Sequence, residues 1–126
     1  MKVENIKFKA KRLDGKGWAI GDLLHSYENG AIIVPIEGGG AFSVDHSTVC
    51  QYTGLKDCDG NELYEHDVIK NYPFIPSEIV LSEELSGYYL THANGKIDEK
   101  PLGYYLSLGK FIVVGNTYEN TNRIER

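Results

Sequence analysis

Residues 51–70 place short strand-forming segments on both sides of a tight turn, and this spacing constrains the fold more than any other feature of the chain. Residues 52–55 have strand character, residues 57–61 form a turn, and further strand-forming residues follow at once. In the turn, Asp57 can hydrogen-bond the backbone ahead of it, and Gly60 can adopt the left-handed conformation that a Cβ disfavours. We expect this tract to shape the backbone of a small β domain rather than to perform chemistry.

The rest of the chain repeats this alternation of short strands and turns. Near the N-terminus, Ile6, Phe8 and Ala10 alternate with lysines, which is typical of a strand with one solvated face. Residues 77–85 fit either a short capped helix or the first half of a hairpin, and the strand character of residues 88–91 favours the hairpin. We predict strands at residues 6–11, 18–20, 31–34, 42–44, 49–55, 68–70, 79–81, 88–91, 104–106 and 111–114, with Leu63 and Tyr64 packing inward. The turns between them include residues 14–17, 29–30, 57–61 and 94–95.

This pattern predicts one mainly β domain over residues 1–126, a small barrel or a curved antiparallel sheet built from hairpins with at most short helices. An α+β arrangement is the alternative. A chain of 126 residues with a 41% hydrophobic content can fold without a disulfide or a structural metal. It has two cysteines, and Met1 to Asn5 lacks the apolar segment of a secretory signal. We therefore expect a cytoplasmic protein with reduced thiols and no membrane segment.

The charge of the chain disfavours nucleic acid as its main partner. The net charge is −5, and affinity for nucleic acid comes largely from neutralising phosphates. Lys7, Lys9 and Lys11 form a local basic stripe that could contact single-stranded nucleic acid. The simpler interpretation is that these lysines protect an edge strand against edge-to-edge aggregation.

The acidic turn begins like a calcium-binding loop. Asp57, Asp59 and Asn61 have the right initial spacing, but Glu62 and Val68 stand where that loop needs glycine and glutamate. We therefore expect an ordinary turn with solvated carboxylates.

His46, Cys50, Cys58 and His66 could in principle supply the four ligands of a zinc ion. They are separated by three, seven and seven residues, and only the first of these spacings is short. Cys50 lies in a predicted strand, where cysteine is usually a small buried residue rather than a nucleophile. We predict no metal site, no cofactor and no catalytic residue, so the chain is not expected to be an enzyme. A deep pocket lined by converging titratable groups would reverse that expectation.

Three segments resemble one family. Residues 51–70 are similar to the central motif of the YopX family, small proteins of bacterial phages and prophages. Residues 6–10 are similar to its opening strand, and residues 114–120 to its closing segment. His66 stands where the family usually has glycine. The resemblance implies no activity, and the motif residues carried over to this chain have structural roles in turns and packing: Gln51, Tyr52, Thr53, Gly54, Leu55, Asp57, Gly60, Leu63, Tyr64 and Asp67.

Two tyrosine pairs are the candidate interaction surface. If Tyr88-Tyr89 and Tyr104-Tyr105 lie in strands, one ring of each pair must point away from the core. Exposed tyrosines on an acidic protein suit a protein partner better than a nucleic acid. We therefore expect a non-enzymatic phage or prophage accessory protein, acting in the host cytoplasm, that binds a protein or itself as an oligomer. The alternative is a small β-barrel that binds single-stranded nucleic acid through the lysine stripe.

Overall fold

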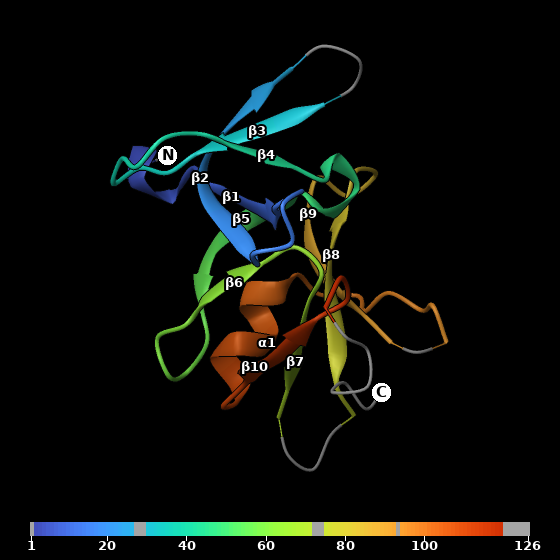
Figure 1. The fold of residues 1–126 in the computed structure, drawn as a ribbon. Coiled ribbons are helices and arrows are strands. Elements are labelled where there is room, and N and C mark those ends of the chain that lie inside the picture. Colours follow the sequence, from blue (N-terminus) through green and yellow to red (C-terminus); the bar gives the residue numbers. More distant parts are fainter. Residues whose placement is uncertain (1, 27–29, 72–74, 93, 120–126) are drawn as a thin grey trace. The chain divides into compact units, whose positions relative to one another are not determined.

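The computed structural model describes residues 2–26, 30–71, 75–92 and 94–119. The protein is mainly β, with 46% strand and 12% helix in two antiparallel sheets, as predicted, and the described strands do not close into a barrel (Figure 1). The chain divides into two compact units, here called unit 1 (residues 1–52) and unit 2 (residues 53–126). Among the described residues, no helix is long and apolar enough to cross a bilayer.

Unit 1 is built on antiparallel strands in the order β4-β3-β2-β1-β5, and β5 continues into unit 2. Its buried core consists of alternate residues on neighbouring strands, because one face of each strand points inward. The elements are η1 (Val3–Asn5), β1 (Phe8–Lys11), β2 (Trp18–His25), β3 (Ala31–Val34), β4 (Phe42–Val44), η3 (His46–Thr48) and β5 (Cys50–Lys56). The core residues are Ala10, Ala19, Ala31, Ile33 and Val44. Of the predicted turn at 29–30, Asn29 lies outside the described residues, whereas β2 and β3 pair antiparallel as that turn requires.

The lysine stripe does not lie on an edge strand, so that interpretation is wrong. β1 pairs with β2 on one side and with β5 on the other. The Nζ atom of Lys7 lies 5.0 Å from the ring centre of Tyr52, and that of Lys9 lies 4.9 Å from the ring centre of Trp18. These lysines lie over aromatic rings of the same sheet, which is a cation–π arrangement rather than edge protection.

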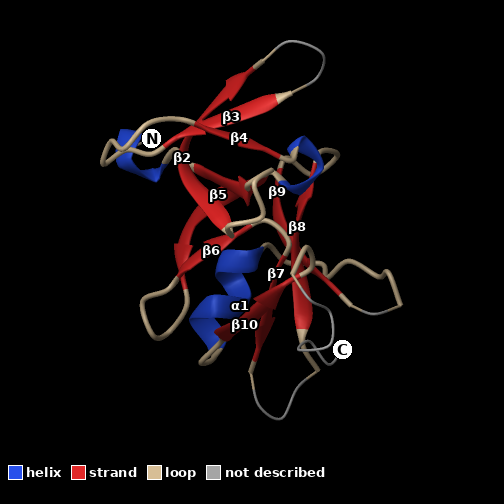
Figure 2. Cartoon of the chain, in the orientation of Figure 1, coloured by secondary structure: helices blue, strands red, loops and turns tan. Residues whose placement is uncertain are grey.

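Unit 2 contains the sheet β10-β7-β8-β9 and the α-helix α1 (Figure 2). Its elements are β6 (Glu62–Tyr64), β7 (Asp67–Lys70), β8 (Ser77–Ser82), β9 (Gly87–Thr91), α1 (Leu102–Leu108) and β10 (Ile112–Asn116). The core residues are Leu63, Ile69, Ile79, Leu90 and Leu102. The hairpin preferred over a helix for residues 77–91 is confirmed, because β8 and β9 pair from Glu78↔Thr91 to Ser82↔Gly87.

The predicted strand at residues 104–106 is wrong, because these residues belong to α1. Pro101 immediately precedes the helix and has a fixed φ. Leu102, Tyr105 and Leu106 then follow a spacing of three and four residues, and all three contact the same core. Tertiary packing therefore overrides the strand preference of the tyrosines. Residues 111–114 are a strand as predicted, but β10 pairs with β7 rather than with residues 104–106.

The turn between β6 and β7 holds its central residue in a left-handed conformation. His66 has φ 70°, in the left-handed region that favours glycine. Its Nδ1 lies 2.8 Å from Glu78 Oε2, and its ring meets that of Tyr118 edge-on at 5.0 Å. The Glu78 hydrogen bond raises the pKa of His66, burial opposes this, and the charge of Glu65 adds to the increase. His66 thus carries both the strain of a left-handed backbone and an ion pair with Glu78 whose strength depends on pH.

The His66→Gly substitution should make the unfolding free energy less dependent on pH. Because the folded-state pKa of His66 is raised, its stabilising contribution is complete below its ordinary value of about 6.5. That contribution is lost as the pH rises through the raised pKa. Glycine also removes left-handed strain of about 1 kcal/mol. In urea titrations between pH 5.5 and 8.5, the unfolding free energy of the variant should therefore increase relative to that of the wild type as the pH rises. His25→Gln is the control. Parallel curves for wild type and His66→Gly would contradict this account.

Candidate functional site

The hairpin of β8 and β9 brings a serine and a histidine together in unit 2. Glu78 pairs with Thr91, and continuing that antiparallel register by one residue sets Ser77 opposite His92. Ser77 Oγ lies 3.1 Å from His92 Nδ1. Ser77 is buried, with 5% of its surface exposed. Strand pairing thus places the two residues opposite each other, and their side chains meet there.

A turn after β9 brings an aspartate to the other side of the same histidine. Gly95 has φ 82°, and its N–H donates to the His92 carbonyl at 2.8 Å. The chain then returns, and the N–H of Asp98 donates to the Leu90 carbonyl at 2.9 Å. Asp98 Oδ1 lies 2.7 Å from His92 Nε2. The Asn94-Gly95 turn therefore completes a chain of three side chains, Ser77–His92–Asp98, which we call the polar triad.

The Asp98 carboxylate at one end of the polar triad determines which groups donate the two hydrogen bonds. A carboxylate only accepts hydrogen bonds, so His92 Nε2 carries the proton donated to Asp98. In the neutral imidazole, Nδ1 then has a lone pair and accepts from the Ser77 hydroxyl. Asp98 thereby fixes the tautomer that lets His92 accept a proton from Ser77.

The polar triad forms one wall of a cavity of about 600 Å³ in unit 2. This volume falls in the range typical of small-molecule sites. The remaining walls are mostly apolar and come from β9, α1 and the segments next to α1 and β8. The cavity residues besides the triad are Asn71, Ile75, Leu90, Tyr105, Leu108 and Phe111. Among these, Ile75 and Leu108 are 67% and 66% exposed, so the mouth is apolar and open to solvent.

Asn71 adds a neutral hydrogen-bond donor to the cavity lining. Its position depends on Gly109, since a Cβ there would lie 2.4 Å from Asn71 Nδ2. Real Cβ atoms do not approach that closely, so the amide can occupy this place only beside a glycine. The cavity therefore combines an apolar interior with a carboxylate, an imidazole, a hydroxyl and an amide.

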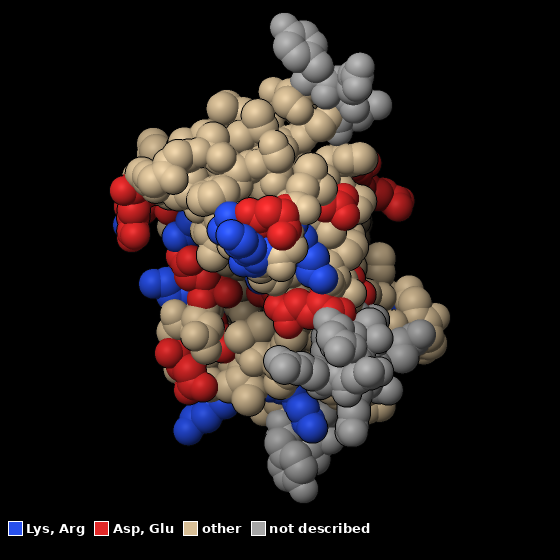
Figure 3. All heavy atoms as spheres, in the orientation of Figure 1, with Lys and Arg blue, Asp and Glu red and all other residues tan. Residues whose placement is uncertain are grey.

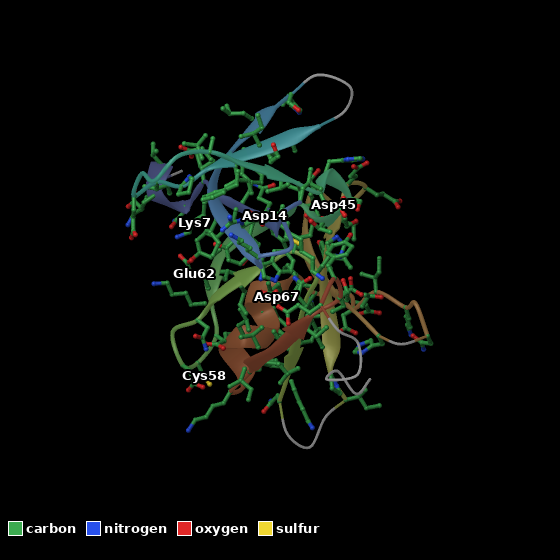
Figure 4. The ribbon with its side chains drawn as sticks, viewed as in Figure 1. Lys7, Asp14, Asp45, Cys58, Glu62 and Asp67 are labelled. Carbon is green, nitrogen blue, oxygen red and sulfur yellow. The ribbon has the colours of Figure 1, made fainter. Side chains whose placement is uncertain are left out.

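The acids of the central motif lie within the backbone framework of unit 2. Asp57 accepts hydrogen bonds from the backbone of Asp59, Asn61 and Val113 and from the Asn61 side chain. Asp67 accepts from Tyr64 N at 2.8 Å and from Asn116 Nδ2 at 2.9 Å (Figure 4).

The other motif residues occupy strands and turns. Gln51 pairs with Phe8, and the buried Tyr52 donates its N–H to the Lys7 carbonyl. Thr53 Oγ1 donates to the Leu63 carbonyl at 2.8 Å. Gly54 and Gly60 have φ of 82° and 86°, Leu55 is partly exposed, and Leu63 and Tyr64 are buried.

The four candidate zinc ligands are divided between the two units. His46 and buried Cys50 belong to unit 1, whereas exposed Cys58 and His66 belong to unit 2. Cys58 lies on the loop between β5 and β6 (Figure 4). In the part of the chain that the structure describes, no three His, Cys, Asp or Glu side chains are grouped to hold a metal ion.

Comparison with known protein families gives a match over nearly the whole chain. The family model described as YopX protein matches residues 7–125. The chain belongs to the YopX family. No curated protein matches this member of the YopX family.

In this YopX family member the four candidate tyrosines have different surroundings. Tyr88 and Tyr105 pack against the core of unit 2, and Tyr105 also lines the cavity. Tyr89 is half-buried in β9, and Tyr104 is 45% exposed on α1, where its ring meets that of Tyr105 edge-on at 5.3 Å. The structure thus connects one of the four with the cavity.

Sequence reasoning did not identify the polar triad. Ser77 and His92 lie in no recognisable catalytic motif. Their contact depends on the register of a hairpin, and the sequence alone does not decide between a hairpin and a helix for residues 77–85. The one sequence feature that points to the site is the Asn94-Gly95 turn, because a chain that reverses there brings Asp98 back towards His92.

Proposed function

We propose that this YopX family member acts by binding, and that the cavity of unit 2 receives apolar side chains of a protein partner. The supporting observation is the open apolar mouth formed by Ile75 and Leu108. A small molecule enclosed in the cavity would leave these two side chains in water, whereas a protein surface would cover them. An aromatic or aliphatic anchor in a pocket with an apolar surround is the usual centre of a protein interface.

The proposal also includes the biological origin and the cellular location that we expect from the sequence. The chain is a phage or prophage accessory protein of the host cytoplasm, and binding without catalysis is sufficient for this role. Tyr105 supplies an aromatic wall for the anchor and Tyr104 lies beside it on α1. Tyr89 belongs to the proposed surface as an additional contact, and Tyr88 supports the strand from the core. A second copy of the chain is an alternative occupant that the same experiment detects.

Photo-cross-linking at the cavity mouth tests the proposal. A photo-reactive benzoylphenylalanine replaces Lys110, which is exposed between the lining residues Leu108 and Phe111. Irradiation in bacterial cells should give one dominant protein adduct. Leu108→Glu should reduce its yield at least about tenfold, because a charge then faces the apolar anchor. Leu85→Glu, at an exposed site outside the cavity, should leave the yield unchanged.

The mass of the adduct distinguishes the occupants. A mass of twice the chain identifies a second copy, and any other single mass identifies a different protein. An adduct that resists Leu108→Glu, or that is lost equally in Leu85→Glu, would contradict binding at the cavity.

Single-stranded nucleic-acid binding is the second candidate function. The observation in its favour is that Lys7, Lys9 and Lys11 place ammonium groups 5.0, 4.9 and 6.0 Å from aromatic ring centres in unit 1. Proteins that bind single-stranded nucleic acid usually combine aromatic rings, which stack on the bases, with cationic side chains, which contact the phosphates. On the face drawn in Figure 3, however, the described basic side chains are interspersed with acidic ones. A fluorescence titration with oligonucleotides at low salt decides the matter, since absence of binding there removes this candidate.

A further inference from the structure

We propose that Ser77 is the nucleophile of an acyl-transfer centre, and that its substrate class is esters of apolar acyl groups. The inference rests on the proposed role of the cavity as a binding site and adds chemistry to it: the acyl group of an ester occupies the same space as the partner's anchor, so the two bind in turn and not together. It reverses the expectation that the chain has no enzymatic activity. The observations that carry it are the hydrogen-bonded polar triad and its position in the wall of an apolar cavity.

The polar triad has the connectivity that activates a serine. The hydroxyl of Ser77 donates to His92 Nδ1 over 3.1 Å, and His92 Nε2 donates to Asp98 Oδ1 over 2.7 Å. A nucleophile in contact with a base, and a base oriented by a third group, is the arrangement required for covalent catalysis. Here Nδ1 rather than Nε2 faces the serine. The chemistry is equivalent, because either ring nitrogen can carry the lone pair when the other holds the proton.

The reaction balances with water as the only co-reactant. Ser77 Oγ forms a bond to the ester carbonyl carbon while its proton passes to His92 Nδ1. The carbon–oxygen bond to the alcohol then breaks, and the alcohol leaves with that proton. Water attacks the acyl group on Ser77 and returns a proton to Oγ through His92, which releases the carboxylic acid. Asp98 stays ionised and stabilises the imidazolium formed in each half.

The walls of the cavity define the acyl group. Leu90, Tyr105 and Phe111 line the same cavity as Ser77, so the part of the substrate attached to the carbonyl carbon must be apolar. The amide of Asn71 and the hydroxyl of Tyr105 also belong to this lining, and they are side-chain donors of the kind that stabilises an oxygen that becomes negatively charged. The glycine at position 109 leaves the space in which that amide lies.

Labelling with a fluorophosphonate tests the nucleophile directly. The full-length protein is incubated with an alkyl fluorophosphonate, and the adduct is located by peptide mass spectrometry. In parallel, hydrolysis of p-nitrophenyl butyrate is followed by absorbance. We expect one adduct, on Ser77, and ester hydrolysis that Ser77→Ala reduces to the rate without protein. Ser107→Ala, an exposed serine of α1 outside the cavity, is the matched control and should keep both signals.

Asp98→Asn separates an activated serine from a merely accessible one. The asparagine amide would donate to Nε2 and move the imidazole proton to Nδ1, so His92 could no longer accept from Ser77. Labelling and hydrolysis should then fall roughly 10³-fold or more, as expected when the tautomer is wrong. Circular dichroism checks that each variant is folded, and His92→Gln replaces Ser77→Ala if the latter is not.

Several results would overturn the inference. These are the absence of a Ser77 adduct on folded wild-type protein, hydrolysis that survives Ser77→Ala, and labelling that is unchanged in Asp98→Asn. Failure here is distinguishable from failure of the proposed binding function, because the Lys110 cross-link does not depend on Ser77 chemistry. A cross-link without labelling leaves binding in place and removes catalysis.

Discussion

Replacing Asp57 by alanine should destabilise unit 2 by about 3 kcal/mol. The side chain of Asp57 is buried, with 6% of the residue exposed, and its two oxygens accept four hydrogen bonds. Three of these shape the turn after β5, and the fourth, from Val113 N at 3.0 Å, ties that turn to β10. The substitution removes all four acceptor contacts at once, and each of them lies in partly buried surroundings.

The Asp57 carboxylate also makes the free energy of unfolding depend on pH in the acidic range. Burial favours the neutral form, but the hydrogen bonds from Val113, Asn61 and Asp59 outweigh it and lower the pKa of Asp57 below its ordinary value. A group with a depressed folded-state pKa stabilises the protein above its unfolded-state pKa, which is about 3.9 for aspartate. This contribution is lost as the pH falls through the folded-state value.

Hydrogen exchange measures this effect where it occurs. Protection of the Val113 amide should fall sharply in Asp57→Ala at pH 7, and the difference from the wild type should shrink below about pH 4. Asp59→Ala is the matched control, because Asp59 is exposed and the turn uses its backbone N–H rather than its side chain. Unchanged Val113 protection in Asp57→Ala would contradict the structural role of this residue.

Gly21→Ala should destabilise unit 1 by about 3 kcal/mol or more. A Cβ at Gly21 would lie 2.2 Å from the Val34 carbonyl oxygen and 2.7 Å from Pro35 Cα. Both atoms belong to the backbone, so no side-chain movement relieves the clash and the pairing of β2 with β3 must shift. The glycine is thus required by close approach of two strands.

The single tryptophan of the chain, Trp18 in β2, reports on this change. The urea midpoint followed by Trp18 fluorescence should fall markedly in Gly21→Ala. Gly103→Ala is the matched control, since a Cβ there meets only a Leu55 methyl at 3.9 Å, and alanine favours the helix α1. Equal midpoints for Gly21→Ala and the wild type would contradict the close approach.

The strands of this fold were largely predictable, because their signals are local. Alternation defines β1, a β-branched run defines β3, and the acidic turn separates β5 from β6. The helix α1 was not predictable from residue preference, since its tyrosines favour strands and only the core contacts of Leu102 and Tyr105 settle the matter. Asn116, at the end of β10, is polar but fully buried, and its amide donates to the buried Asp67 of β7.

The candidate site was less predictable than the fold, and the reason is register. Ser77 and His92 are fifteen positions apart, and they meet only because β8 and β9 pair in one particular register. The cavity also needs α1, which the sequence pattern placed in a strand. A site assembled from a strand, a turn and a helix cannot be recognised until each of the three is correctly placed.

Methyl NMR of the full-length protein tests the central claim, that unit 2 contains a preformed apolar cavity with a polar wall. Benzyl alcohol is a suitable probe, because its ring suits the apolar lining and its hydroxyl can hydrogen-bond to the polar triad. We predict saturable shifts of the Leu90, Leu108 and Ile75 methyl signals, no change at Ile33 and Val44 of unit 1, and loss of the shifts in Leu90→Trp. Shifts that do not saturate, that spread over both units, or that persist in Leu90→Trp would contradict the account.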